Sequence, residues 1–541
     1  MNKAEFLKKQ RSVMRKTNDF LLLKFIITAI VAVLDTLFVI LRMPPVAMGV
    51  WGIIFCAVVY LASFTEMNDV FLSVFKWNAS NDSFSAFALI AVLLRSVSLI
   101  FIQGVTTEVF SPMLFVSIAV SFAAKRSFAM GIKHNIERLR DSENTYLVGS
   151  FKDETGKKYC KAGKGEELPD IVARSYAVDP SEKRGRRFVP IMFAIILLLS
   201  LIVMYIKGFS MFFTALSAMS IVAASLSGEL AFVLPYSTMQ SRMRKKGMVF
   251  FGYSSIASLK DVSAVIVDDS ELFPPEKTAV KKMTIKTTET DTAIRYVDRI
   301  LKEVKSPAAG VFDGLEALDN EIPLTVEAVK YIKDQGISAV INEDKVLFGT
   351  RNLLLANNIE PYSQEKEASL IEENCVMLYL SINGDLSAAM LFEYCCSEEI
   401  KQKIAEATEL DFFIKTKDVA LDKTLIEKDF GIKKSRIFIT NEAEYEFFDK
   451  YEGNLLSGNA KVAMVTTSGT TELANTVLLA KDMAQIFKFS IKSKHLGILV
   501  GVLLCFAALI VTPSAMNFAW LLIYNLIWLL PIIVLSSYRR K

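Results

Sequence analysis

The stretch ASLKDVSAVIVDDSEL, residues 257–272, decides how the second half of the chain folds. Its apolar run from Val262 to Val267 is rich in β-branched residues and ends in two adjacent aspartates. A short apolar run of this kind predicts a buried strand of a parallel sheet. The run VAMV at 462–465 has the same character, and helix-like stretches lie between the two runs. The sequence therefore predicts an α/β domain over about 245–490, interrupted by a further subdomain.

Outside this domain the chain is strongly apolar. Of its 541 residues 52% are hydrophobic, and the mean hydropathy is +0.36, which excludes a soluble enzyme and places much of the chain in lipid. A helix crosses the hydrocarbon core of a bilayer with about 20 apolar residues. We therefore expect a polytopic α-helical membrane protein with about eight transmembrane helices. The apolar runs cover 20–41, 46–64, 84–104, 111–125, 188–206, 210–234, 496–512 and 517–536.

The charged residues predict partners and orientation. The chain has 62 basic and 58 acidic residues, a balance that excludes binding of nucleic acid by bulk charge. Lys and Arg gather in the first 16 residues, after the fourth and sixth apolar runs and at the C-terminal end. Because positive residues beside membrane spans stay on the cytosolic side, we expect both termini and both large loops in the cytosol, in the cell (plasma) membrane. The expected partners are the lipid bilayer and another membrane protein.

The order of spans and insertions resembles that of a known family. Paired helices at 2-2-2-2 spacing, with a small insert after the fourth and a large α/β insert after the sixth, resemble the heavy-metal branch of the P-type ATPases. Leu234-Pro235, the basic stretch 242–247 and the run 257–268 resemble the family's passage from its fourth core helix into its phosphorylation strand. In the family that strand ends in DKTGT, whereas here it ends in DDSEL at 268–272.

Further fragments follow in the family's order and together cover nearly the whole chain. They are Ser306-Pro307 at the place of a His-Pro pair, Gly336-Ile337 at the second half of a GxG signature, VLFGTR at 346–351 for VxVGN, LSING at 380–384 for VAxDG, Thr416-Lys417-Asp418 for TGD, and 462–465 before the place of GDGxND.

The resemblance implies a cytosolic haloacid-dehalogenase-like α/β domain with an inserted α/β nucleotide-domain remnant. The implied segments are a basic cytosolic arm (1–19), transmembrane helices 1–4 (20–125), a reduced actuator-like cytosolic insert (126–187), transmembrane helices 5–6 (188–238), a phosphorylation-like domain in two parts (239–285 and 376–490) around a nucleotide-binding-like domain (286–375), and transmembrane helices 7–8 with the tail (491–541).

The resemblance also implies a set of site residues, with ATP and Mg²⁺ as cofactors. In the family an aspartate attacks the γ-phosphate of ATP while Mg²⁺ bridges the phosphate oxygens. Asp268 stands at the position of that nucleophile. The other candidates are Thr416 and Asp418 for catalysis, Ser306, Pro307, Gly336 and Gly349 for the nucleotide, and Glu229, an acid within a membrane span, for a transport path.

Several departures argue against ATP and Mg²⁺ chemistry. Asp269 replaces the family's lysine after the nucleophile, and Glu271 replaces a glycine. The loop TTSGTT at 466–471 has lost both aspartates that should serve Mg²⁺, and Glu444 stands near the place of the phosphate-clamping lysine. The small insert lacks the TGE tripeptide. The span around 223–232 lacks Cys and Pro, so no heavy-metal site is predicted.

Alternatives remain open for residues and for function. Asp268 could be only a strand-end residue, and Glu229 could be a hydrogen-bonded packing residue. The preferred interpretation is a catalytically impaired pseudo-pump that acts by binding or regulation. One alternative is a divergent ATP-driven cation transporter with Asp268 as the phosphorylated nucleophile, which would make the chain a P-type ATP hydrolase. Another is an ATP-independent channel or lipid-handling protein.

Overall fold

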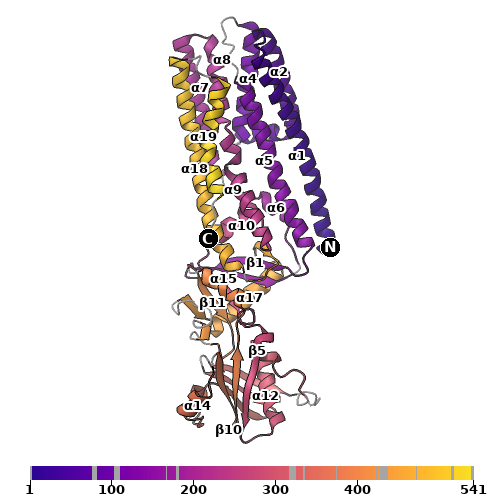
Figure 1. Cartoon of the computed structure of the whole chain (residues 1–541), viewed down its shortest axis with the longest axis vertical. Helices are drawn as coiled ribbons and strands as arrows, with labels where there is room; N and C mark the ends of the chain where they lie inside the picture. Colours follow the sequence, from indigo (N-terminus) through magenta and orange to yellow (C-terminus); the bar gives the residue numbers. More distant parts are fainter. Residues whose placement is uncertain are drawn as a thin grey trace. The chain divides into compact units, whose positions relative to one another are not determined.

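The computed structural model forms two compact units (Figure 1). Unit 1 comprises Met1–Glu143, Leu168–Lys260 and Leu479–Lys541, and unit 2 comprises Asn144–Glu167 and Asp261–Leu478. The described residues are 3–75, 82–102, 110–165, 167–177, 182–315, 324–332, 335–372, 374–407, 409–421, 425–426, 436–470, 472–512 and 517–537.

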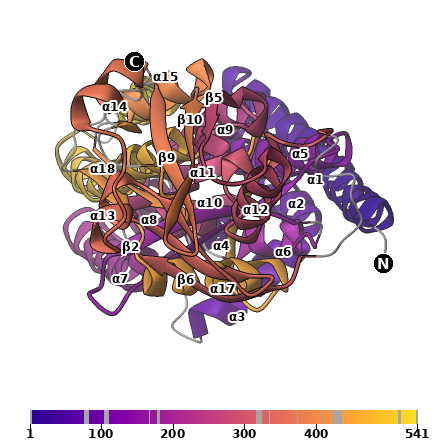
Figure 2. The ribbon, with the colours of Figure 1, turned by 90° about the horizontal axis from the view of Figure 1, so that it is seen from below.

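Long apolar helices dominate the membrane part of the chain. Within the described ranges, seven helices are long and apolar enough to cross a membrane, so this is an integral membrane protein, as predicted. In Figures 1 and 2, α1 and α5 lie side by side. The seven are α1 (Lys3–Ile40), α2 (Pro45–Ala62), α4 (Asp82–Phe101), α5 (Ser111–Arg140), α7 (Glu182–Lys207, of which Gly185–Lys207 is the candidate span), α18 (Leu473–Val511) and α19 (Phe518–Ser536).

The sixth predicted span is divided. Its residues 210–234 form α8 (Ser210–Ala223) and the start of α9 (Leu226–Lys245), so the prediction of one continuous helix there was wrong. The backbone of Ser225 is extended, with φ −74° and ψ 150°. Serine and glycine at 225–228 favour such a break because they have lower helix propensity than the apolar residues on either side. The remaining helices of unit 1 are α3 (Phe64–Phe75), α6 (Ile171–Tyr176) and α10 (Gly252–Leu259), and its strand is β3 (Met248–Phe250).

The small insert predicted at 126–187 does not form one body. Helix α5 continues without a break to Arg140, and α6 and α7 belong to unit 1. Only the middle of the insert, Asn144–Glu167, belongs to unit 2. There Gly156, with φ +87°, lies in the turn of a hairpin between β1 and β2. The hairpin strands pair with strands of the large α/β domain, so the insert contributes to that domain's sheet.

The sheet that contains the predicted strand 262–267 includes, in order, β12, β11, β4, β2, β1 and β13. β4, β11 and β12 are mutually parallel, and β2 pairs parallel with the other side of β4. β1 is antiparallel to both β2 and β13, which makes β13 parallel to β4. The α/β prediction is therefore confirmed. The bounds are β1 (Tyr146–Lys152), β2 (Lys158–Lys164), β4 (Ala264–Asp268), β11 (Asp411–Lys415), β12 (Ile437–Ile439) and β13 (Val462–Thr466), with helices α11 (Asp269–Leu272), α15 (Glu398–Glu406) and α17 (Glu442–Leu456).

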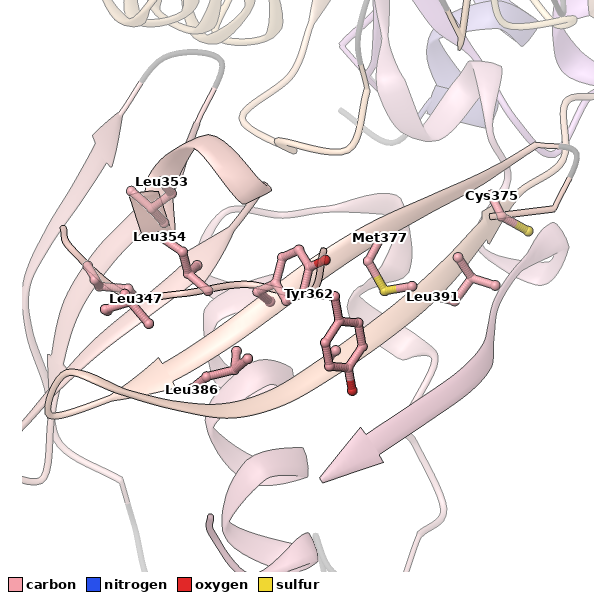
Figure 3. Packing of buried hydrophobic residues seen from close by; sticks show 11 residues of the cluster. Leu347, Leu353, Leu354, Tyr362, Cys375, Met377, Leu386 and Leu391 are labelled. Carbon is pink, nitrogen blue, oxygen red and sulfur yellow. The ribbon is translucent and has the colours of Figure 1, made fainter. Parts of the chain in front are cut away.

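A second sheet of unit 2 has the order β5-β10-β9-β8-β7-β6 and is antiparallel. Its core includes Leu353, Tyr379 and Leu391 (Figure 3). The nucleotide-domain remnant was predicted at 286–375, but this sheet runs from 278 to 394 because the β9–β10 hairpin pairs with β8 and β5. The elements are β5 (Thr278–Ile285), β6 (Val326–Ile332), β7 (Gly336–Ile341), β8 (Asp344–Gly349), β9 (Cys375–Ile382), β10 (Asp385–Tyr394), α12 (Thr290–Glu303), α13 (Arg351–Ala356), α14 (Gln364–Leu370), η1 (Pro275–Lys277) and η2 (Pro307–Gly310).

Candidate functional site

Asp268 is the last residue of β4 and the N-cap of the short helix α11. Its side chain accepts a hydrogen bond from the backbone of Glu271, and the Glu271 carboxyl group accepts one from the backbone N–H of Asp268 at 3.4 Å. This reciprocal arrangement is a capping box, which satisfies the free N–H groups at a helix start. The pattern Asp268-x-x-Glu271 therefore has a structural role, and the sequence interpretation missed it.

A lysine of the inserted hairpin binds the Asp268 carboxylate. Lys161 of β2 places its Nζ 2.8 Å from both carboxylate oxygens of Asp268 and 3.1 Å from Oε2 of Glu452. The Lys161 side chain is only 1% exposed. A buried ammonium group is strongly unfavourable unless it is paired and hydrogen-bonded. Lys161 and Asp268 therefore depend on each other for burial.

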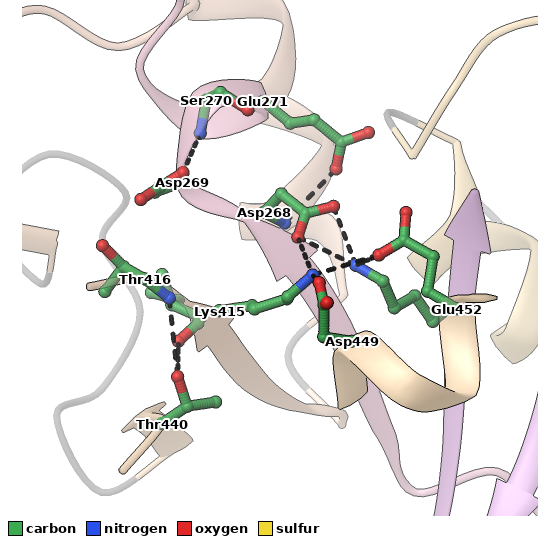
Figure 4. A network of polar contacts seen from close by, with 11 residues as sticks. Asp268, Asp269, Ser270, Glu271, Lys415, Thr416, Thr440, Asp449 and Glu452 are labelled. Carbon is green, nitrogen blue, oxygen red and sulfur yellow. Dashed lines mark hydrogen bonds and ion pairs between the residues drawn. The ribbon is translucent and has the colours of Figure 1, made fainter. Parts of the chain in front are cut away.

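A second lysine extends the charged cluster (Figure 4). The Nζ of Lys415, at the end of β11, lies 2.6 Å from Asp449, 3.1 Å from Glu452 and 3.8 Å from Asp268. Burial alone would lower the pKa of Lys415, but these carboxylates raise it. The cluster borders a cavity of about 380 Å³. Its three carboxylates thus face two ammonium groups of the same chain.

The two other acids beside Asp268 are buried and hold their protons. Burial raises the pKa of Asp269 to about 8, and the nearby charges of Asp418 and Asp268 add to this. Burial, together with the charge of Asp268, raises the pKa of Glu271 to about 7. The sequence interpretation placed a negative charge at Asp269 beside an incoming phosphate. That was wrong at neutral pH, because Asp269 is neutral there, and what the site lacks is the family's cation.

The hairpin also separates two strands that the family's chemistry requires close together. Mg²⁺ binds its ligands at about 2.1 Å, so carboxylates that share one ion must lie on neighbouring chain segments. Between β4 and β13 lie β2 and β1, and three strand spacings amount to about 14 Å. The loop after β13 approaches α11 only through Thr470, whose hydroxyl group hydrogen-bonds to Glu271. No carboxylate of this loop, in the described residues 466–470, stands beside Asp268.

Thr416 and Asp418 lie immediately beyond β11 and are buried. The Thr416 hydroxyl accepts a hydrogen bond from the Asp418 backbone N–H at 2.8 Å, and the Thr416 N–H donates to Thr440 at 3.4 Å (Figure 4). The Asp418 carboxylate accepts from the Tyr394 hydroxyl at 2.7 Å and from the Ser306 hydroxyl. Burial raises the pKa of Asp418. These groups satisfy one another in the interior of unit 2.

The residues proposed for nucleotide binding have structural partners. Ser306 caps η2, which begins at Pro307, and its hydroxyl group binds Asp418. Gly336 and Gly349 face each other across β7 and β8. A Cβ on Gly336 would lie 2.5 Å from the carbonyl oxygen of Phe348 and 2.4 Å from Leu353. The two glycines therefore permit close strand packing, and protein atoms already fill the space that an absent side chain leaves.

The membrane candidate Glu229 lies in α9, a few residues after the end of α8. Its side chain is outside what the structure describes. Helix breaks in a bilayer leave backbone groups that need other partners. At this break the Leu226 N–H donates to Oδ1 of Asn525 at 2.9 Å, and Ser117 donates to the Ala224 carbonyl at 2.5 Å. Lys494, 1% exposed, donates to the carbonyl of Gly228 at 3.2 Å, so side chains of the same chain satisfy the break.

The comparisons with known proteins give no match to a family model and none to a curated protein. Among solved structures, the chain is similar to a zinc-transporting PIB-type ATPase in an E2.Pi state, with TM-score 0.49, 12% identity, and coverage of 96% of this chain and 99% of that chain. For a second zinc-transporting PIB-type ATPase structure, in a different state, the corresponding values are 0.48, 13%, 94% and 99%. The catalytic domain of the CPx-ATPase CopB-B gives 0.27 and 13%, over 44% of this chain and 97% of that chain.

Proposed function

We propose that this chain is a P-type-ATPase-like membrane protein that has lost phosphoryl transfer and acts by binding or regulating another membrane protein. In this proposal unit 2 and both termini face the cytosol, and the location is the cell membrane. Unit 2 corresponds to a haloacid-dehalogenase-like phosphorylation domain with a nucleotide-domain remnant. The protein keeps the framework of a pump, and its charged cluster now stabilises the fold.

The ion pair between Lys161 and Asp268 carries this proposal. A carboxylate that attacks phosphorus needs a free lone pair aimed at the γ-phosphate. Both oxygens of Asp268 accept hydrogen bonds from the Lys161 ammonium group at 2.8 Å. The lysine belongs to a strand within the sheet, so its withdrawal would leave Asp268 and Glu452 without this cation. The resting arrangement therefore opposes nucleophilic attack.

The residues present do not fit a Mg²⁺ ion held between Asp268 and a phosphate. The Lys161 ammonium group occupies the position beside the carboxylate oxygens that such a cation would need. Asp269 is protonated at neutral pH, and a protonated carboxyl group is a poor ligand for a hard cation. Residues 466–470, which stand in the place of the family's Mg²⁺ loop, supply hydroxyl groups and a glycine and no carboxylate.

The test is phosphoenzyme formation from γ-labelled ATP and Mg²⁺ in the purified full chain, quenched in acid. We expect no label in the wild type, under conditions in which an intact P-type ATPase is labelled. Lys161→Met should also remain unlabelled, because removing the ammonium group does not restore a Mg²⁺ loop. Lys157→Met is the matched control, since Lys157 lies next to β2 and pairs with Asp411 at 2.7 Å, away from Asp268.

Label in the wild type that disappears in Asp268→Asn would refute the proposal and favour a divergent ATP-driven cation transporter. Label that appears only in Lys161→Met would show that the lysine alone suppresses a competent site, which would also refute lost chemistry. Ion or lipid movement that ignores ATP, measured with the protein in vesicles, would favour an ATP-independent channel or lipid-handling protein instead.

A further inference from the structure

A second cavity, in unit 1, is lined by residues of α1, α5 and α9 and has a volume of about 400 Å³. Its ionisable lining residues are Arg126 and His134 of α5 and Arg244 of α9, with no carboxylate among the described lining residues. Phe25 of α1 and Met130 of α5 supply apolar wall. The cavity therefore combines a cationic lining with an apolar border.

Two buried donors at this cavity have no hydrogen-bond partner among the described residues. They are Nε of Arg126 and Nε2 of Gln240, whose residue is 2% exposed. Gln240 packs closely on α5, because a Cβ on Gly131 would lie 2.2 Å from its Oε1 atom. Buried donors without acceptors are rare in folded proteins and call for a water, an ion or a ligand. Two donors at one cationic cavity indicate an anion.

Other groups near the cavity strengthen this preference. Glu137 is the acid whose charge acts on Arg244, and its carboxylate is also engaged at 2.8 Å by Arg11. The hydroxyl groups of Ser127 and Ser237 lie 3.4 Å apart in the lining and can donate to an added acceptor. The internal carboxylate is thus shared between two arginines, and the cavity keeps an excess of donors.

We propose that this cavity binds the phosphate group of an anionic ligand. Arginine's planar fork of N–H donors matches phosphate oxygens, and Arg126 and Arg244 supply two such forks from neighbouring helices. Arg126 directly follows the apolar run 111–125, and Arg244 lies in the last turn of α9. Basic pockets between helices at the membrane surface bind lipid headgroups. A phospholipid headgroup and a soluble phosphate share this chemistry.

The test measures thermal unfolding of the purified full chain in detergent while one probe is titrated. The probes are dihexanoyl phosphatidylglycerol, inorganic phosphate and the phosphate-free dihexanoylglycerol. We expect a saturable rise in melting temperature with a phosphate-bearing probe only. The double variant Arg126→Gln/Arg244→Gln should raise the concentration at half-effect at least tenfold. The matched control Arg138→Gln/Lys245→Gln removes two exposed charges from the same helices and should leave that concentration unchanged.

Arg126→Lys keeps the charge and removes the fork, so it should fold and still weaken the response several-fold. A response to phosphatidylglycerol alone identifies a lipid headgroup, and an equal response to inorganic phosphate identifies a soluble ligand; either supports the site. The proposal is overturned if the phosphate-free lipid is as effective, if neither phosphate probe shifts the melting temperature, or if the control variant loses as much as the double variant.

Discussion

The charged cluster at Asp268 and the cavity at Arg126 differ in how their charges are satisfied. At Asp268 the chain supplies its own cations, Lys161 and Lys415, at 2.6–3.8 Å from the carboxylates. At the cavity, Arg126 Nε and Gln240 Nε2 have no acceptor among the described residues. A ligand gains little at a site that is already neutralised, and gains more where donors lack partners. The difference teaches that the former chemical site has become structural and that ligand binding belongs elsewhere.

The largest expected effect comes from breaking the neutralised cluster. Lys161→Met should lower the free energy of unfolding by about 3 kcal/mol, because it leaves Asp268 and Glu452 without a buried cation. Thermal unfolding of the purified chain measures this. Lys157→Met is the control and should change stability by less than about 1 kcal/mol, since its ion pair is partly exposed.

The double variant Lys161→Met/Asp268→Asn tests the pairing directly. Removing both charges should recover part of the lost stability, because the neutral amide needs no counter-ion. Additive losses in the two single variants would mean that the two side chains do not stabilise each other. In that case the structural interpretation of the cluster would fail.

The next effect concerns the protonated acids beside Asp268. The pKa of Asp269 is raised to about 8 in the folded chain, so the folded state keeps a proton that the unfolded state releases above about pH 4. Stability is therefore fully present below that pH and is lost as the pH rises toward 8, by up to about 1.4 kcal/mol per pH unit. Glu271 acts in the same direction up to about pH 7.

Melting temperatures at pH 6 and pH 8 measure this dependence. The wild type should be less stable at pH 8 by about 2 kcal/mol. Asp269→Asn should show a much smaller difference, because its amide does not titrate. A variant that retains the full wild-type difference would place the titrating group elsewhere in the chain.

A smaller effect tests whether the glycines at the proposed nucleotide position serve packing. Gly336→Ala should cost about 2 kcal/mol, because its Cβ would meet the Phe348 carbonyl oxygen at 2.5 Å. Gly453→Ala is the matched control, since Gly453 lies within α17 and nothing lies within 4 Å of its Cβ position. It should stabilise the chain by about 0.5–1 kcal/mol. Equal behaviour of the two variants in thermal unfolding would contradict the packing interpretation.

The sequence could predict elements that depend on local patterns. The apolar runs gave seven of the membrane-length helices, and Val262–Val267 and 462–465 gave two buried strands of the α/β sheet. Strand neighbours could not be predicted, because pairing of residues 146–164 with β4 depends on contacts between segments about 100 residues apart. Lys161 was missed for the same reason. The Asp268-x-x-Glu271 capping box was a local signal that could have been recognised.

The smallest expected effect tests a third place where the chain satisfies itself, the break between α8 and α9. Asn525 is 1% exposed, and its Oδ1 accepts from the Leu226 N–H at 2.9 Å. Asn525→Leu removes that acceptor, and single hydrogen bonds within membrane proteins are worth about 0.6 kcal/mol on average. We expect a loss of about 1 kcal/mol, because the orphaned donor belongs to the backbone and is buried.

Asn525→Asp is the matched variant, because it keeps an acceptor of the same size at the same position. It should retain more stability than Asn525→Leu when the medium is acidic enough to protonate the new carboxyl group. If Asn525→Leu were as stable as the wild type in thermal unfolding, the Leu226 N–H would have another acceptor. The break would then resemble the cavity at Arg126, where groups await a partner from outside the chain, more than the neutralised cluster at Asp268.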